Sequence, residues 1–512
     1  MQSRHRLAVA VVWFAIAACS EPAAPRATLV ADRAQAQADS VPGLDRLEHI
    51  VVISLENHSF DNLYGEFPGA DGRADAAGTT TQVDATGTPY ATLPVNAGSP
   101  FPTTLANAPF PIEQYVPADQ KIPDLVHRYY QEQLQIDGGR MDKFALVSDA
   151  KGEVMGFYRT AGLPLAAEAA RYTLCDHFFH AAFGGSFLNH FWLIAARTPV
   201  FPGAPAAVIA RFDTAGKLVA DGFVTPDGYA VNTAFSVNLP HPATTPVVRL
   251  VPNQTFPTIG DRLSERHITW AWYAGGWDAA LAGHAAPLFQ FHHQPFIYFA
   301  NYADGTPAKA AHLRDETAFF AAARAGALPA VSFVKPLGPD NEHPGYADMV
   351  TGEQHTLELI NAVRNGPDWK NTAIIITYDE HGGFWDHVAP PVVDRWGPGS
   401  RVPTLIISPF ARRGYVDHHT FDTTSILALI EHRWRLAPLT SRDAAAGDLT
   451  TAFDFSQGPW TSRVAGPRPG RRRPSPACGV VARERHLVAT PCCASFPTPA
   501  RAGRDPYHSR KT

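Results

Sequence analysis

The sequence predicts an α/β fold with a doubly wound, mostly parallel sheet flanked by helices. Short apolar runs rich in Ile and Val have the length of buried strands, and they lie at residues 50–54, 268–273, 331–334, 373–377 and 402–407. Helical patterns lie between several of these runs, and strand–helix–strand alternation is typical of a parallel sheet. Two of the runs also end in adjacent polar residues, at the edge where open α/β sheets gather their ligands.

Two of the expected helices have clear boundaries. Asp315 can cap a helix that runs to Ala325 and is closed by Gly326. A second helix is expected over residues 353–365, where apolar residues fall near one face before Gly366-Pro367 ends the pattern.

Residues 199–250 differ from the rest of the chain. Turn signals at residues 213–216 and 226–228 separate short alternating segments. We expect a small β-rich excursion here, which would form a wall or lid over a site.

The chain is long enough to bury a large core. Of its 512 residues 45% are hydrophobic, and 45 Pro and 39 Gly indicate many ordered loops, which often carry functional sites. The formal charge of −5 is uneven, because residues 463–512 hold eleven Lys or Arg against two Asp or Glu. The remainder is therefore near −14, and this mildly acidic body argues against nucleic acid as the main partner.

Residues 1–18 have the features of an export signal. Arg4 and Arg6 precede an apolar stretch over residues 7–18, which is too short to span a membrane. The end of this stretch resembles a bacterial lipobox, so we expect cleavage before Cys19 and a lipid on that residue. The protein would then lie in the periplasm or cell envelope and touch the membrane only through this anchor. The alternative is an ordinary signal peptide with a chance Cys.

We expect four segments along the chain: a signal peptide at 1–18, a flexible tether at 19–45, a folded domain at 46–460 and a basic, disordered tail at 461–512. Nucleic-acid binding by the tail and an aberrant C-terminus are the alternatives there. Of the five Cys, only Cys175 lies in the folded domain. No disulfide framework is therefore available to this domain, and Cys175 is most simply a small core residue.

Polar residues follow two of the predicted strands. Glu56-Asn57 comes after the run at 50–54, and Asp379-Glu380 comes after the run at 373–377. Carboxyl ends of parallel strands meet at one edge of a sheet, and oxygen donors suit hard or borderline cations. The two pairs are candidate ligands of a divalent metal ion.

A third segment, over residues 182–190, has a serine after two glycines. Ser186 can lie at a tight turn with its hydroxyl exposed, although the segment lacks the GxSxG pattern of serine hydrolases. A serine hydroxyl is a weak nucleophile unless a base or a metal ion activates it. A cation held near Ser186 would supply that activation.

Three groups of histidines lie beside acidic or aromatic residues. They are His127, the pair His292-His293, and His343. Imidazole can contact phosphoryl oxygens or protonate a leaving group near neutral pH. Zinc-protease, P-loop and dinucleotide-binding motifs are absent from the sequence.

Together these segments resemble the bacterial phosphoesterase family. The resemblance rests on residues 56–61, 183–190, 341–345 and 378–383, in the family's order, and covers roughly residues 47–460. The family contains metal-dependent acid phosphatases and phosphatidylcholine-type phospholipases C, and it belongs to the alkaline phosphatase superfamily. The resemblance implies the sulfatase-like α/β fold, a phosphate ester as substrate and one divalent metal ion. Several divalent ions would suit such ligands.

The resemblance also implies roles for individual residues. The metal ligands would be Glu56, Asn57, Asp379, Glu380 and the nucleophile Ser186. The histidines that contact the phosphoryl group would be His127, His343 and one of His292 and His293; His293 is favoured, but the pair stays open. His387 lies in a further family motif and is a candidate substrate-binding residue, as are Asn57 and His292.

The version of the motifs around Ser186 and His293 looks like the acid phosphatase branch of the family. We therefore expect hydrolysis of phosphomonoesters through a phosphoseryl intermediate, with an acidic optimum. The alternatives are a phospholipase C acting on choline phosphodiesters, a non-catalytic surface lipoprotein, and a serine hydrolase without a metal. Phospholipase members typically carry Thr at the position of Ser186. The residues after Ser186 disfavour a sulfatase.

Overall fold

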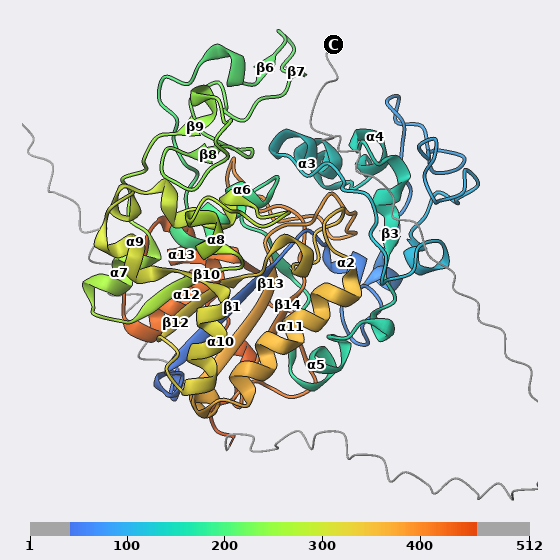
Figure 1. The fold of residues 1–512 in the computed structure, drawn as a ribbon. Coiled ribbons are helices and arrows are strands. Elements are labelled where there is room, and N and C mark those ends of the chain that lie inside the picture. The colour runs from blue at the N-terminus through green and yellow to red at the C-terminus, as the bar shows by residue number, and fades with distance from the viewer. Residues whose placement is uncertain (1–40, 458–512) are drawn as a thin grey trace, which may run out of the picture. The chain divides into compact units, whose positions relative to one another are not determined.

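The computed structural model describes residues 41–457, and these residues are built around one eight-stranded sheet (Figure 1). The strand order is β11-β10-β12-β1-β13-β14-β4-β15. In this order the strands are Leu313–Asp315, Trp270–Ala274, Val331–Lys335, His49–Leu55, Thr372–Tyr378, Thr404–Ile407, Thr173–Cys175 and Tyr415–Asp417. The expected signal peptide, most of the tether and the basic tail lie outside the described residues.

The sheet is mostly parallel, as predicted. Only β14 runs antiparallel to its neighbours, β13 and β4. The central strand β1 pairs in parallel with β12 and β13, so that Ile53 lies beside Val334 on one side and Ile376 on the other. This register brings the carboxyl ends of β12, β1 and β13 to the same edge.

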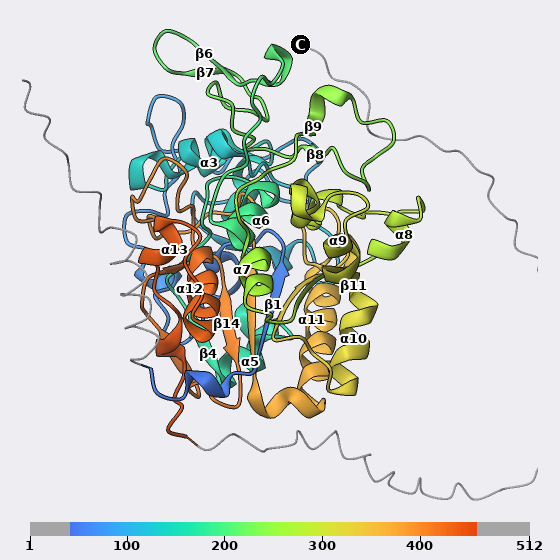
Figure 2. The same cartoon turned by 90° about the vertical axis from the view of Figure 1, so that its left-hand side faces the viewer.

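Helices cover both faces of the sheet, which confirms the doubly wound class. Figure 2 shows α10 and α11 on one side of the strands and α12 and α13 on the other. Helix α6 contacts α12. The helices are α2 Phe60–Leu63, α3 Tyr129–Ile136, α4 Phe144–Val147, α5 Ala166–Arg171, α6 Ser186–Ala195, α7 Ile259–Glu265, α8 Trp277–Leu281, α9 Pro307–His312, α10 Glu316–Ala325, α11 Met349–Arg364, α12 Thr423–Trp434 and α13 Ser441–Ala445. No helix of the described residues is long and apolar enough to cross a membrane.

The predicted caps explain where two helices begin. The Asp315 carboxylate accepts a hydrogen bond from the Thr317 amide at the start of α10, and Gly326 ends this helix in the left-handed region at φ 68°. Helix α11 begins four residues before the expected start, at Met349. The reason is a cap that the prediction overlooked: the Asp348 side chain accepts from the Thr351 amide.

The excursion at 199–250 contains less strand than expected. Its paired strands are β6 Arg211–Phe212 with β7 Leu218–Ala220, which form a hairpin, and β8 Phe235–Ser236 with β9 Leu250–Val251. Isolated bridges join Val200 to Tyr229 and Val224 to both Ile209 and Ala230. The hairpin turn follows the sequence signal, because the Asp213 carboxylate accepts from the amides of Ala215 and Lys217. Other short pairs elsewhere are β2 Phe110–Pro111 with β3 Gly156–Phe157, and β5 Phe178–Phe179 with β16 Phe421–Asp422.

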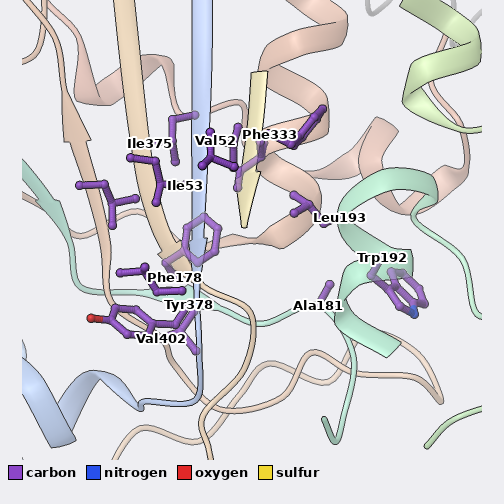
Figure 3. Packing of buried hydrophobic residues seen from close by; sticks show 14 of the residues in the cluster. Val52, Ile53, Phe178, Ala181, Trp192, Leu193, Phe333, Ile375, Tyr378 and Val402 are labelled. Carbon is purple, nitrogen blue, oxygen red and sulfur yellow. The ribbon is translucent and has the colours of Figure 1, made fainter. Parts of the chain in front are cut away.

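The core lies between the central strands and the flanking helices. Figure 3 shows Val52, Ile53 and Ile375 of the central strands near Phe333 of β12, with Leu193 of α6 close by. All five side chains are at most 2% exposed. Burying one such side chain stabilises a fold by about 1.5–3 kcal/mol. This packing holds the sheet edge rigid under the polar residues that follow it. Cys175 is a buried, free thiol in β4, as expected.

Candidate active site

The polar residues at the ends of three neighbouring strands converge at one point. Glu56 follows β1, Asp379 follows β13, and Lys335 is the last residue of β12. The Lys335 ammonium lies 2.5 Å from Glu56 Oε1 and 3.0 Å from Asp379 Oδ2. Lys335 and Glu56 are fully buried, and Asp379 is 4% exposed. The predicted meeting of the two carboxylates at the sheet edge is confirmed, and a lysine stands between them.

Ser186 joins this group from the first turn of α6. Its hydroxyl lies 2.9 Å from Glu56 Oε2, to which it donates, and 3.3 Å from Asn57 Oδ1. The turn before it needs glycine, because Gly184 has φ +88° and a Cβ there would lie 2.4 Å from the Tyr129 amide nitrogen. The serine is therefore fixed against a carboxylate that can orient it.

The loop after β13 approaches Asn57 just as closely. A Cβ on Gly382 would lie 2.0 Å from the Asn57 carbonyl oxygen, and Gly382 has φ +65°. Asn57 itself has φ 68°, which is uncommon outside glycine. Strain of this kind is typical of backbone that is held in place around a functional site.

The two members of the histidine pair lie at different distances from the strand-end carboxylates. His293 Nε2 lies 2.9 Å from Glu56 Oε1, whereas His292 stands behind it with a ring centroid 4.8 Å away. The His292 carbonyl lies 3.3 Å from His190 Nδ1, and His190 Nε2 lies 3.1 Å from Asp379 Oδ2. His293 is thus the member that touches the strand-end carboxylates.

His127 and His343 form the opposite wall. Their ring centroids are 5.6 Å apart, and His127 Nε2 lies 3.4 Å from Asn57 Nδ2. In each ring Nδ1 is close to a carbonyl oxygen, that of Leu125 for His127 and that of Pro344 for His343. A carbonyl only accepts, so Nδ1 carries the proton and Nε2 is left to act on a substrate.

The charges at the site are strongly perturbed. Burial would raise the pKa of Glu56, but Lys335 and His293 hold it well below its ordinary value. Burial alone would likewise lower the pKa of Lys335, but Asp379 and Glu56 raise it. Burial raises the pKa of Glu380 well above its ordinary value, and the charge of Asp379 adds to this. The site therefore holds an ionised Glu56 and, at Glu380, a buried carboxyl whose nearest basic group is His127, 3.9 Å from its Oε1.

A divalent cation fits these residues. Glu380 Oε2 accepts from the Gly382 amide, but Glu380 Oε1 is buried without a hydrogen-bond partner. An unpaired carboxylate oxygen in a dry site is costly, and a cation would satisfy it. The oxygens available are those of Glu56, Asn57, Ser186, Asp379 and Glu380, which are the predicted ligands. Glu56 and Asp379, together with His190, also place ligand atoms within 4.8 Å of one another.

His387 lies in a second cluster and not in hydrogen-bond contact with Ser186. Its Nδ1 lies 2.6 Å from Asp61 Oδ2, and its Nε2 lies 3.0 Å from Asp71 Oδ1. The buried Arg401 pairs with Asp386 and reaches Asp61 in the same cluster. The predicted contact of His387 with substrate stays a prediction. The contacts of His387 in the structure hold the segment that follows Asn57.

Replacing His387 by Gln is expected to remove a pH-dependent part of the stability. Burial would lower the pKa of His387, but the hydrogen bond and charge of Asp61 raise it from 6.5 to about 9. This contribution, on the order of 3 kcal/mol, is complete below the unfolded pKa and is lost as the pH rises through the folded one. Urea unfolding should therefore show the largest difference between wild type and H387Q near pH 6 and a small one near pH 10.

The exposed His284 supplies the control for this experiment, because H284Q should leave the stability unchanged at both pH values. A difference between wild type and H387Q that is the same at both pH values would contradict the assigned ion pair.

Glu132 ties the serine loop to the loop of Glu380. Its Oε2 accepts from the Gly184 amide at 2.5 Å, and its Oε1 lies 2.8 Å from His180 Nε2 and 3.6 Å from His381 Nε2. The carboxylate is fully buried. Burial would raise its pKa, but His180 and His381 lower it to about 2. Glu132 is therefore a charged brace between the nucleophile and one predicted metal ligand.

Substituting Gln for Glu132 is expected to destabilise the fold by about 3 kcal/mol, because two buried histidines lose their carboxylate. We also expect a fall in turnover of about tenfold, since the serine loop loses a fixed acceptor. Urea unfolding and initial rates measure the two effects. Glu153 is the matched control: it is 6% exposed, burial raises its pKa, and E153Q removes little charge interaction. Equal losses of stability and of turnover in E132Q and E153Q would show that Glu132 does not hold the serine loop in place.

Three residues of this constellation were missed in the sequence analysis: Lys335, His190 and Glu132. Lys335 carried a usable signal, since it directly follows the apolar run at 331–334, as Glu56 and Asp379 follow theirs. His190 lies one helical turn after Ser186 and could have been placed by that spacing. Glu132 gave no signal, because only the tertiary fold brings α3 under the serine loop.

An α/β sheet with a serine, paired carboxylates and histidines at its carboxyl edge defines a hydrolase-type site. Comparison with known proteins gives the family. The model of the Phosphoesterase family matches residues 47–437. The chain belongs to this family, and hydrolysis of phosphoric esters is the chemistry that its relatives support.

Several relatives are named phospholipases C. The non-hemolytic phospholipase C of Pseudomonas aeruginosa is 25% identical over 459 residues, covering 81% of this chain and 58% of that protein. Phospholipase C B of Mycobacterium tuberculosis is 26% identical, covering 82% of this chain and 80% of that protein. The chain thus spans somewhat over half the length of the Pseudomonas relative. Among solved structures, a protein of the alkaline phosphatase superfamily from Vibrio parahaemolyticus is similar with a TM-score of 0.33 and 11% identity, covering 65% of this chain and 73% of that chain.

Proposed function

We propose that this protein is a metal-dependent phosphoester hydrolase with Ser186 as its nucleophile. The observation that carries the proposal is the hydrogen bond of 2.9 Å from the Ser186 hydroxyl to the ionised Glu56. Ser186 also lies at the N-terminus of α6, a ten-residue helix whose free amides and dipole favour an anion such as a phosphoryl group.

The residues can be assigned to the steps of an in-line displacement. Glu56 orients the Ser186 hydroxyl and accepts its proton as the oxygen attacks phosphorus. The Asn57 amide nitrogen can donate to a phosphoryl oxygen, and Nε2 of His127 and His343 can do so when the ring is protonated, which fixes the orientation of the phosphoryl group. A protonated histidine gives its proton to the leaving alcohol, and water then hydrolyses the phosphoserine. A divalent ion held by Glu56, Asn57, Ser186, Asp379 and Glu380 would supply charge to the phosphoryl oxygens when bound.

For the substrate we propose a phosphodiester of the phosphatidylcholine type. The support is the series of relatives named phospholipases C that align over about four-fifths of the chain. Hydrolysis of phosphomonoesters, as in acid phosphatases, is the second candidate. Two features favour the acid phosphatase: serine at position 186, and the segment of His293, a residue that lies against Glu56.

An assay of product and metal dependence tests both proposals. The purified full chain is given phosphatidylcholine and a phosphomonoester in parallel, with and without a chelator, across a range of pH. Phosphocholine release that stops with chelator and returns with metal supports the phospholipase C proposal. Release of inorganic phosphate instead supports the acid phosphatase. No turnover of either substrate with metal restored would contradict the proposed chemistry.

We also propose export of the protein and a lipid anchor on Cys19. Both rest on the sequence alone, because residues 1–40 lie outside the described part. Mass spectrometry of the mature N-terminus from membranes tests this proposal: an unmodified, freely soluble mature chain would contradict it.

A further inference from the structure

Large apolar side chains that are exposed to solvent are concentrated on two segments. We name these the excursion, residues 199–250, and the valine loop, residues 389–396. The two segments hold about a seventh of the described residues but nine of their thirteen exposed large apolar side chains. These nine are Val200, Phe212, Val219, Val237, Leu239, Val247, Val248, Val392 and Val393.

The excursion is anchored beside the active site. Arg128, next to the active-site His127, pairs with Asp221 of the excursion at 2.5 Å. The Phe212 ring of the hairpin meets Tyr130 of α3 edge to face, with centroids 5.1 Å apart. In Figures 1 and 2 the hairpin β6–β7 lies at the same end of the described chain as α3 and α6. The excursion is therefore joined to the start of α3, directly after the active-site His127.

The valine loop is anchored to the same place. The Trp396 carbonyl accepts from the amide of Phe183, three residues before Ser186, at 2.7 Å. Arg395 forms two hydrogen bonds to Asp227 of the excursion, at 2.7 and 3.0 Å. The Trp396 and Tyr229 rings add an edge contact with centroids 4.9 Å apart. The two segments are thus joined to each other and to the serine loop.

Eight of these nine exposed side chains are aliphatic, and Phe212 is the exception. Val392 is fully exposed, Val247 is 80% exposed and Val219 is 59% exposed. These three side chains lie on different segments: Val219 on the hairpin, Val247 on a 3₁₀ turn and Val392 on the valine loop. Apolar residues spread over protruding loops can each insert into a fluid lipid layer without a matching partner surface.

Basic residues accompany these aliphatic side chains. Arg211 and Lys217 of the hairpin are exposed and have no ion pair with any described residue. The nearby carboxylates of Asp221 and Asp227 pair with Arg128 and Arg395. Asp213 of the same hairpin is exposed and accepts only from backbone amides, so the hairpin carries two basic charges against one acidic charge. Unpaired basic charge beside exposed aliphatic side chains complements the phosphate groups of a lipid surface.

We propose that the excursion and the valine loop form a docking surface for a lipid–water interface. The proposal rests on the proposed action on phospholipids and adds the place where the enzyme meets its aggregated substrate. Docking through these segments would present a phosphodiester headgroup at the edge of the sheet where Ser186 lies, while the acyl chains stay in the lipid layer.

Vesicle binding tests the docking surface directly. The full chain carrying S186A, which prevents hydrolysis, is mixed with vesicles of phosphatidylcholine and sedimented. These zwitterionic vesicles are chosen because the eleven basic residues of 463–512 would themselves attract anionic lipid. The triple variant V219D/V247D/V392D is expected to bind at least about tenfold more weakly. The matched control is L281D, at the end of α8, where Leu281 is 47% exposed but lies outside both segments.

Activity assays with Ser186 intact separate docking from catalysis. The triple variant should hydrolyse a soluble short-chain choline phosphodiester like wild type, but vesicle phosphatidylcholine about tenfold more slowly. Equal vesicle binding by the triple variant and by the protein with wild-type segments would overturn the docking surface. No vesicle binding by the protein with wild-type segments would overturn it too, and would point to a protein partner. Loss of soluble activity in the triple variant would also overturn it. The wild type could also bind vesicles and hydrolyse neither substrate, while the triple variant loses vesicle binding. That result would support the docking surface and refute the proposed function.

Discussion

Replacing Ser186 by Ala is expected to lower phosphoester turnover by about 10⁴-fold or more while the fold stays intact. The hydroxyl is the only proposed nucleophile, it donates to Glu56 at 2.9 Å, and it lies at the start of α6. The stability should change little, by about 1 kcal/mol, because one hydrogen bond is lost while Lys335 and His293 remain beside Glu56. Initial rates at saturating substrate, together with thermal unfolding, measure both effects.

Ser54 is the matched control for this substitution. It is a buried serine on β1, two residues before Glu56, and its hydroxyl has no hydrogen-bond partner. S54A should keep the wild-type rate, because it removes a hydroxyl near the site but outside the chemistry. If S186A also kept most of the rate, Ser186 would be a ligand or a structural serine and the phosphoserine step would be wrong.

The parts of this protein that could be predicted from sequence are those fixed by local patterns. Apolar runs locate β1, β12 and β13, and parallel pairing then brings their last residues to one edge. Glu56 and Asp379 could therefore be placed together from the sequence alone. Asp315 and Gly326 bound α10 because capping depends only on neighbouring residues.

Of the three residues that were missed, Glu132 is the one whose role depends wholly on long-range packing. Glu132 lies on α3, far along the chain from Gly184 and His381, and only the fold brings these three together. For His387 the motif position predicts contact with substrate, which stays a prediction, and the contacts that the structure shows are with Asp61 and Asp71. A family motif marks positions that matter but does not separate contact with substrate from support of the site.

Replacing Lys335 by Met is expected to destabilise the metal-free protein by about 3–5 kcal/mol. The buried ammonium lies 2.5 Å from Glu56 and 3.0 Å from Asp379, and both carboxylates are almost wholly buried. Without the lysine they would face each other in a dry site, where His190 and His293 are the histidines that lie within 3.1 Å of them. A side chain of similar length that lacks charge leaves that repulsion uncompensated.

A divalent cation should restore much of the stability lost in K335M, because it supplies positive charge to the same two carboxylates. The measurement is the unfolding temperature of wild type and K335M, each with chelator and with added metal. We expect a larger rise on adding metal for K335M than for wild type. Lys309 supplies the control, since it is also a buried lysine but pairs with Asp304, which is no predicted metal ligand. Any stability that K309M loses should therefore be the same with chelator and with added metal. An equal metal-induced rise in unfolding temperature for wild type and K335M would show that the metal does not bind through Glu56 and Asp379. Its ligands would then be other residues at the sheet edge.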